Sequence, residues 1–416
     1  MSGPEPRGTE GLAERRAALQ LLDGVLRRGV TLDSAAQRTA AEHRPLALAI
    51  AGETLRRLPE LDAMIDSATR LRLADDAKAR MVLRLALAQK LAMNVPDHAL
   101  VATALPLVDG GPRRLVHGVL GTLLRRSPVA SDAPALPAAV EERWTAGWGE
   151  ETVAAARRAI VRRPPLDLSF AEDGAAQAFA SDNSGVSLAP HHVRLTGGAA
   201  VHDLPGYGEG GWWVQDLAAS LPARLIPRHA ATVLDLCAAP GGKTMQLASR
   251  GHRVTAVDRS ESRLARLSEN LRRTGLDAVT AASEAMAWSQ GDYDAVLLDA
   301  PCSATGTFRR HPEVLYRASS RIIAESAERQ GELLGHAASL LKPGGTLVYA
   351  VCSLEPEEGE AIVTGAPDTL ALDPVRADEL PAGITAHERG WLRVLPGMLE
   401  AEGGVDGFFI ARLVRR

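Results

Sequence analysis

Two of the three cysteines in this 416-residue chain lie where thiol chemistry is expected. Cys302 follows the apolar run Tyr293 to Leu298, in a motif Asp-Ala-Pro-Cys-Ser that begins at Asp299, and Cys352 follows the apolar run Thr346 to Ala350. Short apolar runs of this kind predict buried strands. In a doubly wound sheet, ligands bind outside the carboxyl ends of the strands. The sequence therefore predicts a pocket in which two thiols are available for chemistry.

The third cysteine, Cys237, ends another apolar run and opens a loop with two adjacent glycines. Glycine lets a backbone approach a ligand where a Cβ atom would obstruct it, and the helix expected to start near Lys243 offers free N–H groups. The loop has neither the Gly-x-Gly-x-x-Gly pattern nor the spacing of a P-loop, which disfavours a dinucleotide or a triphosphate. The residues that we expect to border a cofactor here are Cys237, Ala238, Ala239, Pro240, Gly241, Gly242 and Lys243. Because free cysteine is among the most buried residue types, we interpret Cys237 itself as a packing residue.

An acidic residue, Asp258, ends the next predicted strand. A carboxylate at that point can accept both hydroxyls of a ribose. S-adenosylmethionine presents a ribose without a diphosphate, which fits the loop described above. A glycine turn followed by a helix-capping aspartate would explain each element separately, but the combination favours a nucleoside cofactor.

The elements that must position these residues divide the chain into three parts. Apolar residues recur at helical spacing over residues 11–127, which predicts an all-α domain assigned to residues 1–130. A Pro- and Ala-rich linker over 127–139 leads into a small mixed segment, residues 131–210. From 211 to 416, strands and helices alternate, which predicts an α/β domain with a parallel sheet covered on both faces. The expected strands are 232–237, 252–257, 293–299, 345–351 and 407–414, and the clearest helices are 260–274 and 319–341.

Composition excludes several classes of protein. No window approaches the roughly 18 to 20 apolar residues that a membrane span needs, and the polar start, Met1 to Glu10, does not resemble a secretory signal. Three cysteines cannot all pair, and no Cys-x-x-Cys or His-x-x-x-His pattern suggests a metal site. We therefore expect a cytoplasmic protein without a membrane or metal partner. No sequence pattern indicates the oligomeric state, and a monomer is the default expectation.

Charge is distributed unevenly along the chain. Residues 1–126 contain 19 Lys and Arg against 14 Asp and Glu, whereas the remainder contains 28 against 37. Binding to a phosphate backbone needs a local basic surface rather than a basic total. The excess of basic over acidic residues in the helical part is compatible with RNA binding and equally with an ordinary solvated surface.

Three long motifs, over residues 235–244, 298–312 and 349–358, resemble the Nop/Sun family of RNA (cytosine-5) methyltransferases. Residues 211–216 and 406–409 add shorter matches. Within that family the chain is most similar to bacterial members that modify small-subunit ribosomal RNA, and its helical part resembles NusB-type domains. The resemblance implies a class I, Rossmann-like, seven-stranded S-adenosylmethionine-dependent core with an antiparallel last strand, preceded by an all-α NusB-like RNA-binding domain.

The resemblance also implies roles for individual residues. Carbon 5 of cytosine becomes nucleophilic once a thiolate adds to carbon 6, which is covalent catalysis. By the family pattern, Cys352 is the attacking nucleophile and Cys302 assists breakdown of the adduct. We assign Asp299 to the base ring, where it holds a proton toward nitrogen 3, and to the cofactor border. Two roles are compatible with Lys243: a contact to the methionine carboxylate of the cofactor, or help in ionising a thiol.

Some positions depart from the family or allow two interpretations. Glu284 stands where the family usually has an aspartate near the adenine, and Val351 stands where threonine is common. Arg309, Arg310 and His311 follow the catalytic loop and are either RNA phosphate ligands or a solvated loop.

Two aromatic side chains and an acidic run complete the open assignments. Trp212 and Trp213 either stack a base or pack in the core, with packing favoured. The acidic run Glu355, Glu357 and Glu358 is expected to be a solvated helix start.

The function that the sequence favours is methylation of carbon 5 of a cytosine in RNA, with 16S ribosomal RNA as the expected target. One alternative is a transfer RNA methyltransferase with the same core. Another is a non-catalytic RNA-binding or assembly factor, against which the presence of both thiols and Asp299 argues.

Overall fold

The computed structural model describes residues 11–197 and 200–416, and the chain divides into two compact units. The first unit contains the residues up to Arg162 together with Phe308–Ser319, and the second contains Arg163–Thr307 and Ser320–Arg416. The boundary after Arg162 lies within the mixed segment expected at 131–210, whose own bounds stay a prediction. Residues 1–10, where we expected no secretory signal, lie outside the described residues.

The first unit is helical, as the apolar periodicity predicts. Its helices bury two adjoining apolar clusters, centred on residues such as Leu21, Ile50, Leu83 and Leu120. Segment 308–319 joins this unit, since the Tyr316 hydroxyl donates to the Leu55 carbonyl oxygen at 2.6 Å. The helices are α1 (Leu12–Arg28), α2 (Leu32–Ala36), α3 (Arg44–Arg56), α4 (Leu58–Ser67), α5 (Lys78–Met93), α6 (Asp97–Ala104), α7 (Gly110–Arg125), α8 (Ala138–Val161) and α13 (Val314–Arg317).

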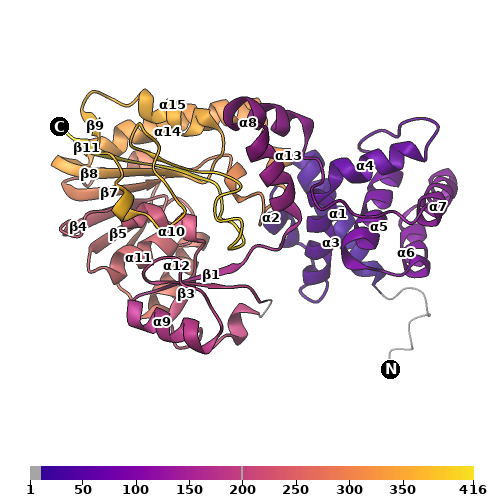
Figure 1. Ribbon diagram of the computed structural model, residues 1–416, viewed down its shortest axis with the longest axis horizontal. Coiled ribbons are helices and arrows are strands. Elements are labelled where there is room, and N and C mark those ends of the chain that lie inside the picture. Colours follow the sequence, from indigo (N-terminus) through magenta and orange to yellow (C-terminus); the bar gives the residue numbers. More distant parts are fainter. Residues whose placement is uncertain (1–10, 198–199) are drawn as a thin grey trace. The chain divides into compact units, whose positions relative to one another are not determined.

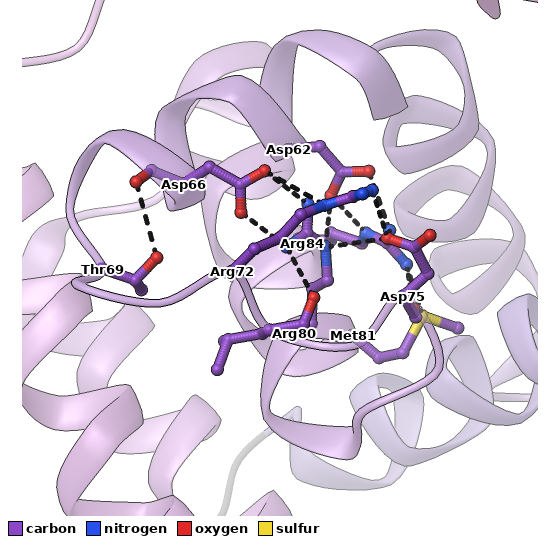
Figure 2. A network of polar contacts seen from close by, with 9 residues as sticks. Asp62, Asp66, Thr69, Arg72, Asp75, Arg80, Met81 and Arg84 are labelled. Atoms are coloured by element: carbon purple, nitrogen blue, oxygen red, sulfur yellow. Dashed lines mark hydrogen bonds and ion pairs between the residues drawn. The ribbon is translucent and has the colours of Figure 1, made fainter.

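A cluster of ion pairs links α4, α5 and the loop between them (Figure 2). Arg80 and Arg84, both buried, reach the Asp62 carboxylate at 3.0 and 2.7 Å, and Arg80 also pairs with Asp66 at 2.6 Å. The hydrogen bond from Arg80 lowers the pKa of Asp66. Two of the basic residues counted in the helical part are therefore neutralised internally and add nothing to a basic surface.

The second unit contains two sheets. The smaller is antiparallel, with strand order β2-β1-β3, and holds a buried ion pair between Arg194 and Asp167 at 2.7 Å. Its elements are β1 (Leu166–Phe170), α9 (Asp173–Asp182), β2 (His192–Leu195) and β3 (Trp212–Val214). The elements of the larger layer are α10 (Leu217–Arg224), β4 (Thr232–Leu236), α11 (Gly242–Ser249), β5 (Arg253–Asp258), α12 (Glu261–Thr274), β6 (Val279–Ala282), β7 (Tyr293–Asp299), α14 (Ser320–Ser339), β8 (Leu341–Val351), α15 (Glu360–Thr364), β9 (Leu370–Leu372), β10 (Leu392–Val394) and β11 (Phe408–Arg415).

The larger sheet has the order β10-β11-β8-β7-β4-β5-β6, with β9 as an additional partner of β11. Strands β6, β5, β4, β7 and β8 run parallel, and β11 runs antiparallel to β8. The fold class and the antiparallel last strand are thus confirmed. Beyond the seven strands of that path, β9 adds an eighth, because both β9 and β10 pair with the free edge of β11.

Helices cover both faces of this sheet (Figure 1). Alternate residues along each strand face opposite sides, so Val233, Leu297 and Val348 pack with α10 and α11. Leu234 and Leu298, on the other face, pack with α14. Near-continuous apolar strands are typical of a sheet buried on both faces. Within the described residues, no helix has the length and apolar character that a bilayer crossing requires.

Candidate active site

The loop expected to border a cofactor follows β4, and backbone contacts fix its conformation. Cys237 adopts a positive φ of 63°, and the Ala238 N–H donates to the Val257 carbonyl oxygen at 3.0 Å. Gly241, with a φ of 104°, is the N-cap residue of α11, and a Cβ atom there would lie 2.6 Å from Leu267 Cγ. Only glycine fits a site that combines this φ with so close a neighbour. The loop therefore brings bare backbone to the carboxyl end of β4.

Asp258 ends β5 beside this loop, at the place where a ribose contact was expected. One carboxylate oxygen accepts the Ala239 N–H at 3.1 Å, and the other accepts the Ser260 N–H at 2.9 Å. Arg263 lies 3.6 Å from the first of these oxygens. Each carboxylate oxygen has two lone pairs, so each retains capacity to accept a hydroxyl.

A cavity of about 340 Å³ opens next to Asp258. This volume lies in the range of small-molecule sites, which are mostly apolar with a few polar groups that fix orientation. Glu284, for which a contact to adenine stays a prediction, lines the cavity and is exposed, and Arg329 from α14 also lines it. The lining residues include Cys237, Val257, Asp258, Arg259, Arg263, Glu284, Met286, Pro301, Arg329 and Leu333.

Lys243, in the first turn of α11, forms an ion pair with Asp299 at the carboxyl end of β7. Lys243 Nζ lies 2.8 Å from Asp299 Oδ2 and 5.5 Å from the centre of the Phe408 ring. Burial works against the Lys243 ammonium, but the adjacent Asp299 carboxylate outweighs it and raises the pKa of Lys243. The Lys243 ammonium therefore points at Asp299, a contact that the sequence did not predict.

The two predicted catalytic thiols come together. The sulfur atoms of Cys302 and Cys352 are 3.6 Å apart, at the ends of the adjacent strands β7 and β8. The hydrogen bond to Cys352 and burial raise the pKa of the Cys302 thiol well above its usual range. Both cysteines are partly exposed, which leaves a side from which a substrate can approach.

Close backbone contacts hold the two cysteine loops in register. The Ala300 N–H donates to the Ala350 carbonyl oxygen at 2.9 Å, and the Gly306 N–H donates to the Cys352 carbonyl oxygen at 3.0 Å. A Cβ atom on Gly306 would lie 2.0 Å from the Gly407 carbonyl oxygen. A side chain at Gly306 would therefore push the Cys302 loop away from Gly407, the residue that precedes β11.

Two other ionisable groups near the site are unsuited to thiolate or carboxylate chemistry. Burial, with the nearby Asp299 and Asp258 charges, raises the pKa of the Cys237 thiol to about 12. This agrees with the packing role expected for Cys237. Burial likewise raises the pKa of Asp235 to about 7, although the Thr244 hydroxyl donates to it at 2.6 Å.

Comparison with known proteins agrees with this geometry. Residues 222–414 match the family described as 16S rRNA methyltransferase RsmB/F, and residues 12–125 match the NusB family. The chain is 35% identical to ribosomal RNA small subunit methyltransferase B of Xylella fastidiosa, over 98% of this chain and 99% of that protein. It is 31% identical to the Klebsiella pneumoniae protein of the same name, over 97% and 98% of the two chains.

The chain belongs to the ribosomal RNA small subunit methyltransferase B family. It is accordingly an RNA methyltransferase with a NusB-family helical domain. Among solved structures, a methyltransferase homologue from Pyrococcus horikoshii is similar, with 26% identity and a TM-score of 0.56 over 67% of this chain and 95% of that chain.

For a methyltransferase of this family, the suggested RNA contacts after the catalytic loop remain predictions. Arg309 is buried, Arg310 is half-buried, and the His311 side chain is half-exposed. Of these three, His311 is the most accessible to a phosphate. Trp212 and Trp213 are both buried, in agreement with packing rather than base stacking.

The expectation of a solvated acidic helix start is wrong for two of its three residues. Glu355 and Glu358 are buried, and only Glu357 is exposed. The Glu358 carboxylate turns inward and accepts hydrogen bonds from Ser303 and Ser353, the residues that follow Cys302 and Cys352. The Cys-Ser pair at both strand ends was the signal in the sequence that could have indicated a shared acceptor.

Proposed function

We propose that this protein transfers a methyl group from S-adenosylmethionine to carbon 5 of a cytosine in 16S ribosomal RNA. In this proposal Cys352 forms a covalent bond to carbon 6 of the base, and Cys302 assists its resolution. The observation that carries the proposal is the pair of sulfur atoms 3.6 Å apart, at the same sheet edge as a nucleoside-sized cavity.

The cavity beside Asp258 suits the cofactor in size and chemistry. Asp258 would hold the ribose hydroxyls, Glu284 would accept from the adenine amino group, and the backbone at Gly241 and Gly242 would border the methionine part. When bound, S-adenosylmethionine supplies the methyl group from a sulfonium centre. The Val257, Met286 and Leu333 side chains give the cavity an apolar surface for a flat base.

The two thiols are suited to different steps. The raised pKa of Cys302 keeps its proton in place, and its S–H group can donate to the Cys352 sulfur, which favours Cys352 as the thiolate that attacks carbon 6. Once the Cys352 sulfur is bonded to carbon, it no longer carries a negative charge. The main cause of the raised pKa of Cys302 then disappears, so the Cys302 thiol can release its proton to water, and the resulting thiolate can accept the hydrogen of carbon 5.

The Lys243–Asp299 pair is placed to stabilise the base ring during attack. Addition of the Cys352 thiolate to carbon 6 moves negative charge toward ring nitrogen 3. A proton shared at the 2.8 Å contact between Lys243 and Asp299 can be offered to that nitrogen. Groups preorganised where charge develops are commonly the largest single contribution to catalysis.

The test is methyl transfer from labelled S-adenosylmethionine to 16S ribosomal RNA or to transfer RNA, followed by mapping of the modified base. Cys352→Ala is expected to lose turnover and to form no covalent RNA adduct. Cys302→Ala is expected to accumulate an adduct that survives a denaturing gel. Methylation at a position other than carbon 5, or an equal adduct-free loss in both variants, would overturn the proposal. Preference for transfer RNA would favour the alternative substrate, and no transfer at all would favour an assembly factor.

A further inference from the structure

Glu358 is a buried carboxylate that connects the two cysteine loops. Its Oε1 accepts the Ser303 N–H at 2.8 Å, and its Oε2 accepts the hydroxyls of both Ser303 and Ser353. Gln330 Nε2 donates to Oε1 at 3.2 Å. Ser303 directly follows Cys302, and Ser353 directly follows Cys352. One carboxylate therefore receives donors from the residue adjacent to each thiol.

The surrounding contacts tie the same groups to one another. The Ser303 and Ser353 hydroxyl oxygens are 3.1 Å apart, and the Thr305 hydroxyl accepts the Leu354 N–H at 3.0 Å. The Tyr349 hydroxyl donates to the Glu358 carbonyl oxygen at 2.6 Å, which fixes the backbone that carries the carboxylate. Removing the carboxylate would leave several buried donors without an acceptor, each at a cost of about 1–3 kcal/mol.

Two of the four groups around the Glu358 carboxylate are N–H donors, and the other two are hydroxyls, which can donate or accept. A carboxylate has about four lone-pair sites, which matches these four groups. A glutamine of the same shape can keep an oxygen at the two N–H donors only if its NH₂ group faces the two hydroxyls. Substitution by glutamine therefore preserves volume but replaces the two hydrogen bonds from the hydroxyls to the carboxylate, which weakens the connection between the loops.

We infer that Glu358 is a positioning residue that sets the separation of the Cys302 and Cys352 sulfur atoms. This inference rests on the proposed function for its catalytic consequence, because the two thiols act in consecutive steps on one base. Glu358 touches neither sulfur; it acts through Ser303 and Ser353. A loop shift of about 1 Å far from the reacting atoms can cost on the order of 100-fold in rate.

The experiment measures thiol separation and catalysis independently. Phenylarsine oxide, which binds two neighbouring thiols on one arsenic atom, is titrated against the free protein, with Cys352→Ala as the reference for single-thiol binding. Glu358→Gln is expected to weaken dithiol capture roughly ten-fold, because the two sulfurs lose their fixed spacing. Its kcat is expected to fall about 10- to 100-fold, while the KM values for RNA and cofactor stay within about two-fold.

The matched control is Glu357→Gln, the same substitution at the adjacent exposed residue, which is expected to behave like the wild type in both assays. If Glu358→Gln melts below the assay temperature, Ser353→Ala replaces it, with capture expected to weaken about three-fold from loss of one hydrogen bond. Wild-type dithiol capture in the folded variant would overturn the inference even in an active enzyme. Failure of the wild type to methylate cytosine would instead overturn the proposed function, since the capture assay uses neither RNA nor cofactor.

Discussion

Strand β7 carries an aspartate near each end, and each aspartate pairs with a lysine. At the amino end, Asp294 Oδ1 lies 2.6 Å from Lys342 Nζ. At the carboxyl end, Asp299 Oδ2 lies 2.8 Å from Lys243 Nζ. The two pairs have nearly the same geometry on the same strand, so the difference between them must come from their surroundings.

The two aspartates differ in the number of hydrogen bonds that each carboxylate already accepts. Asp294 Oδ2 also accepts the N–H groups of Ala231 and Thr232, at 3.0 and 2.8 Å, and Lys342 is well exposed to solvent. Asp299, within the part of the chain that the structure describes, has Lys243 as its one hydrogen-bonding partner, and the Lys243 side chain is only 12% exposed. A carboxylate saturated by backbone fixes a turn, whereas one with free lone pairs beside two thiols is available to a substrate. This asymmetry agrees with ligand binding at the carboxyl ends of parallel strands.

The largest expected effect concerns Asp235 on the adjacent strand β4, for which the described residues provide the Thr244 hydroxyl as a donor but no paired cation. Burial raises the pKa of Asp235 to about 7 in the folded protein, from an unfolded value near 3.8. A raised folded pKa means that the folded state binds the proton more tightly, so this contribution to stability is present below pH 4 and is lost as the pH rises to about 7. Three pKa units correspond to about 4 kcal/mol.

The measurement is the free energy of unfolding of the wild type and of Asp235→Asn from pH 4 to pH 8. The difference between the two proteins is expected to change by about 4 kcal/mol in favour of the variant as the pH rises. Taking the difference removes the pH dependence of the other carboxylates. A difference that stays constant with pH would show that Asp235 titrates normally.

The next effect concerns Lys243 and Lys342, the two lysines that pair with the aspartates of β7. Lys243→Met removes the ammonium beside Asp299 and leaves a carboxylate charge next to the thiols, which disfavours the Cys352 thiolate. We expect kcat for methyl transfer to fall about 100-fold, equivalent to about 2.7 kcal/mol in the barrier. The matched control is Lys342→Met, expected to retain the wild-type rate within about two-fold, because surface pairs contribute at most about 1 kcal/mol to stability. Similar methyl transfer rates in both variants would show that the lysine at the carboxyl end of β7 is no more important for catalysis than the lysine at the amino end.

Much of this site could be predicted from the chain alone, because its residues lie where strands end. The apolar runs before Cys237, Cys302 and Cys352 indicated β4, β7 and β8, and parallel strands bring their carboxyl ends to one edge. The strand preceding Asp258 was equally clear. Short strands such as β6, β9 and β10 were missed because three or four residues give no reliable periodicity.

Other features depend on contacts between distant residues, which a local pattern does not encode. Glu358 looked like part of a solvated acidic run, yet it is buried because Ser303, 55 residues earlier, supplies its donors. Segment 308–319 follows the catalytic loop in sequence but folds with the helical unit through Tyr316 and Leu55. In both cases a burial that appears only in the tertiary structure overrides the local polarity of the sequence.

The smallest expected effect is at the amino end of β7 and concerns stability alone. Asp294→Ala leaves the N–H groups of Ala231 and Thr232 without their acceptor, which is expected to lower the free energy of unfolding by about 2 kcal/mol. The hydrogen bond from Lys342 and those from Thr232 lower the pKa of Asp294, so its contribution is complete above pH 4 and declines as the pH falls from there toward the lowered folded pKa. Chemical denaturation should therefore show a smaller difference between the variant and the wild type at pH 3 than at pH 7, without abolishing it. Because Asp294 lies at the opposite end of the strand from the thiols, the methyl transfer rate of the folded variant is expected to be unchanged. A lower rate at full folding would mean that strand β7 transmits strain along its length, and the two ends could no longer be treated as independent.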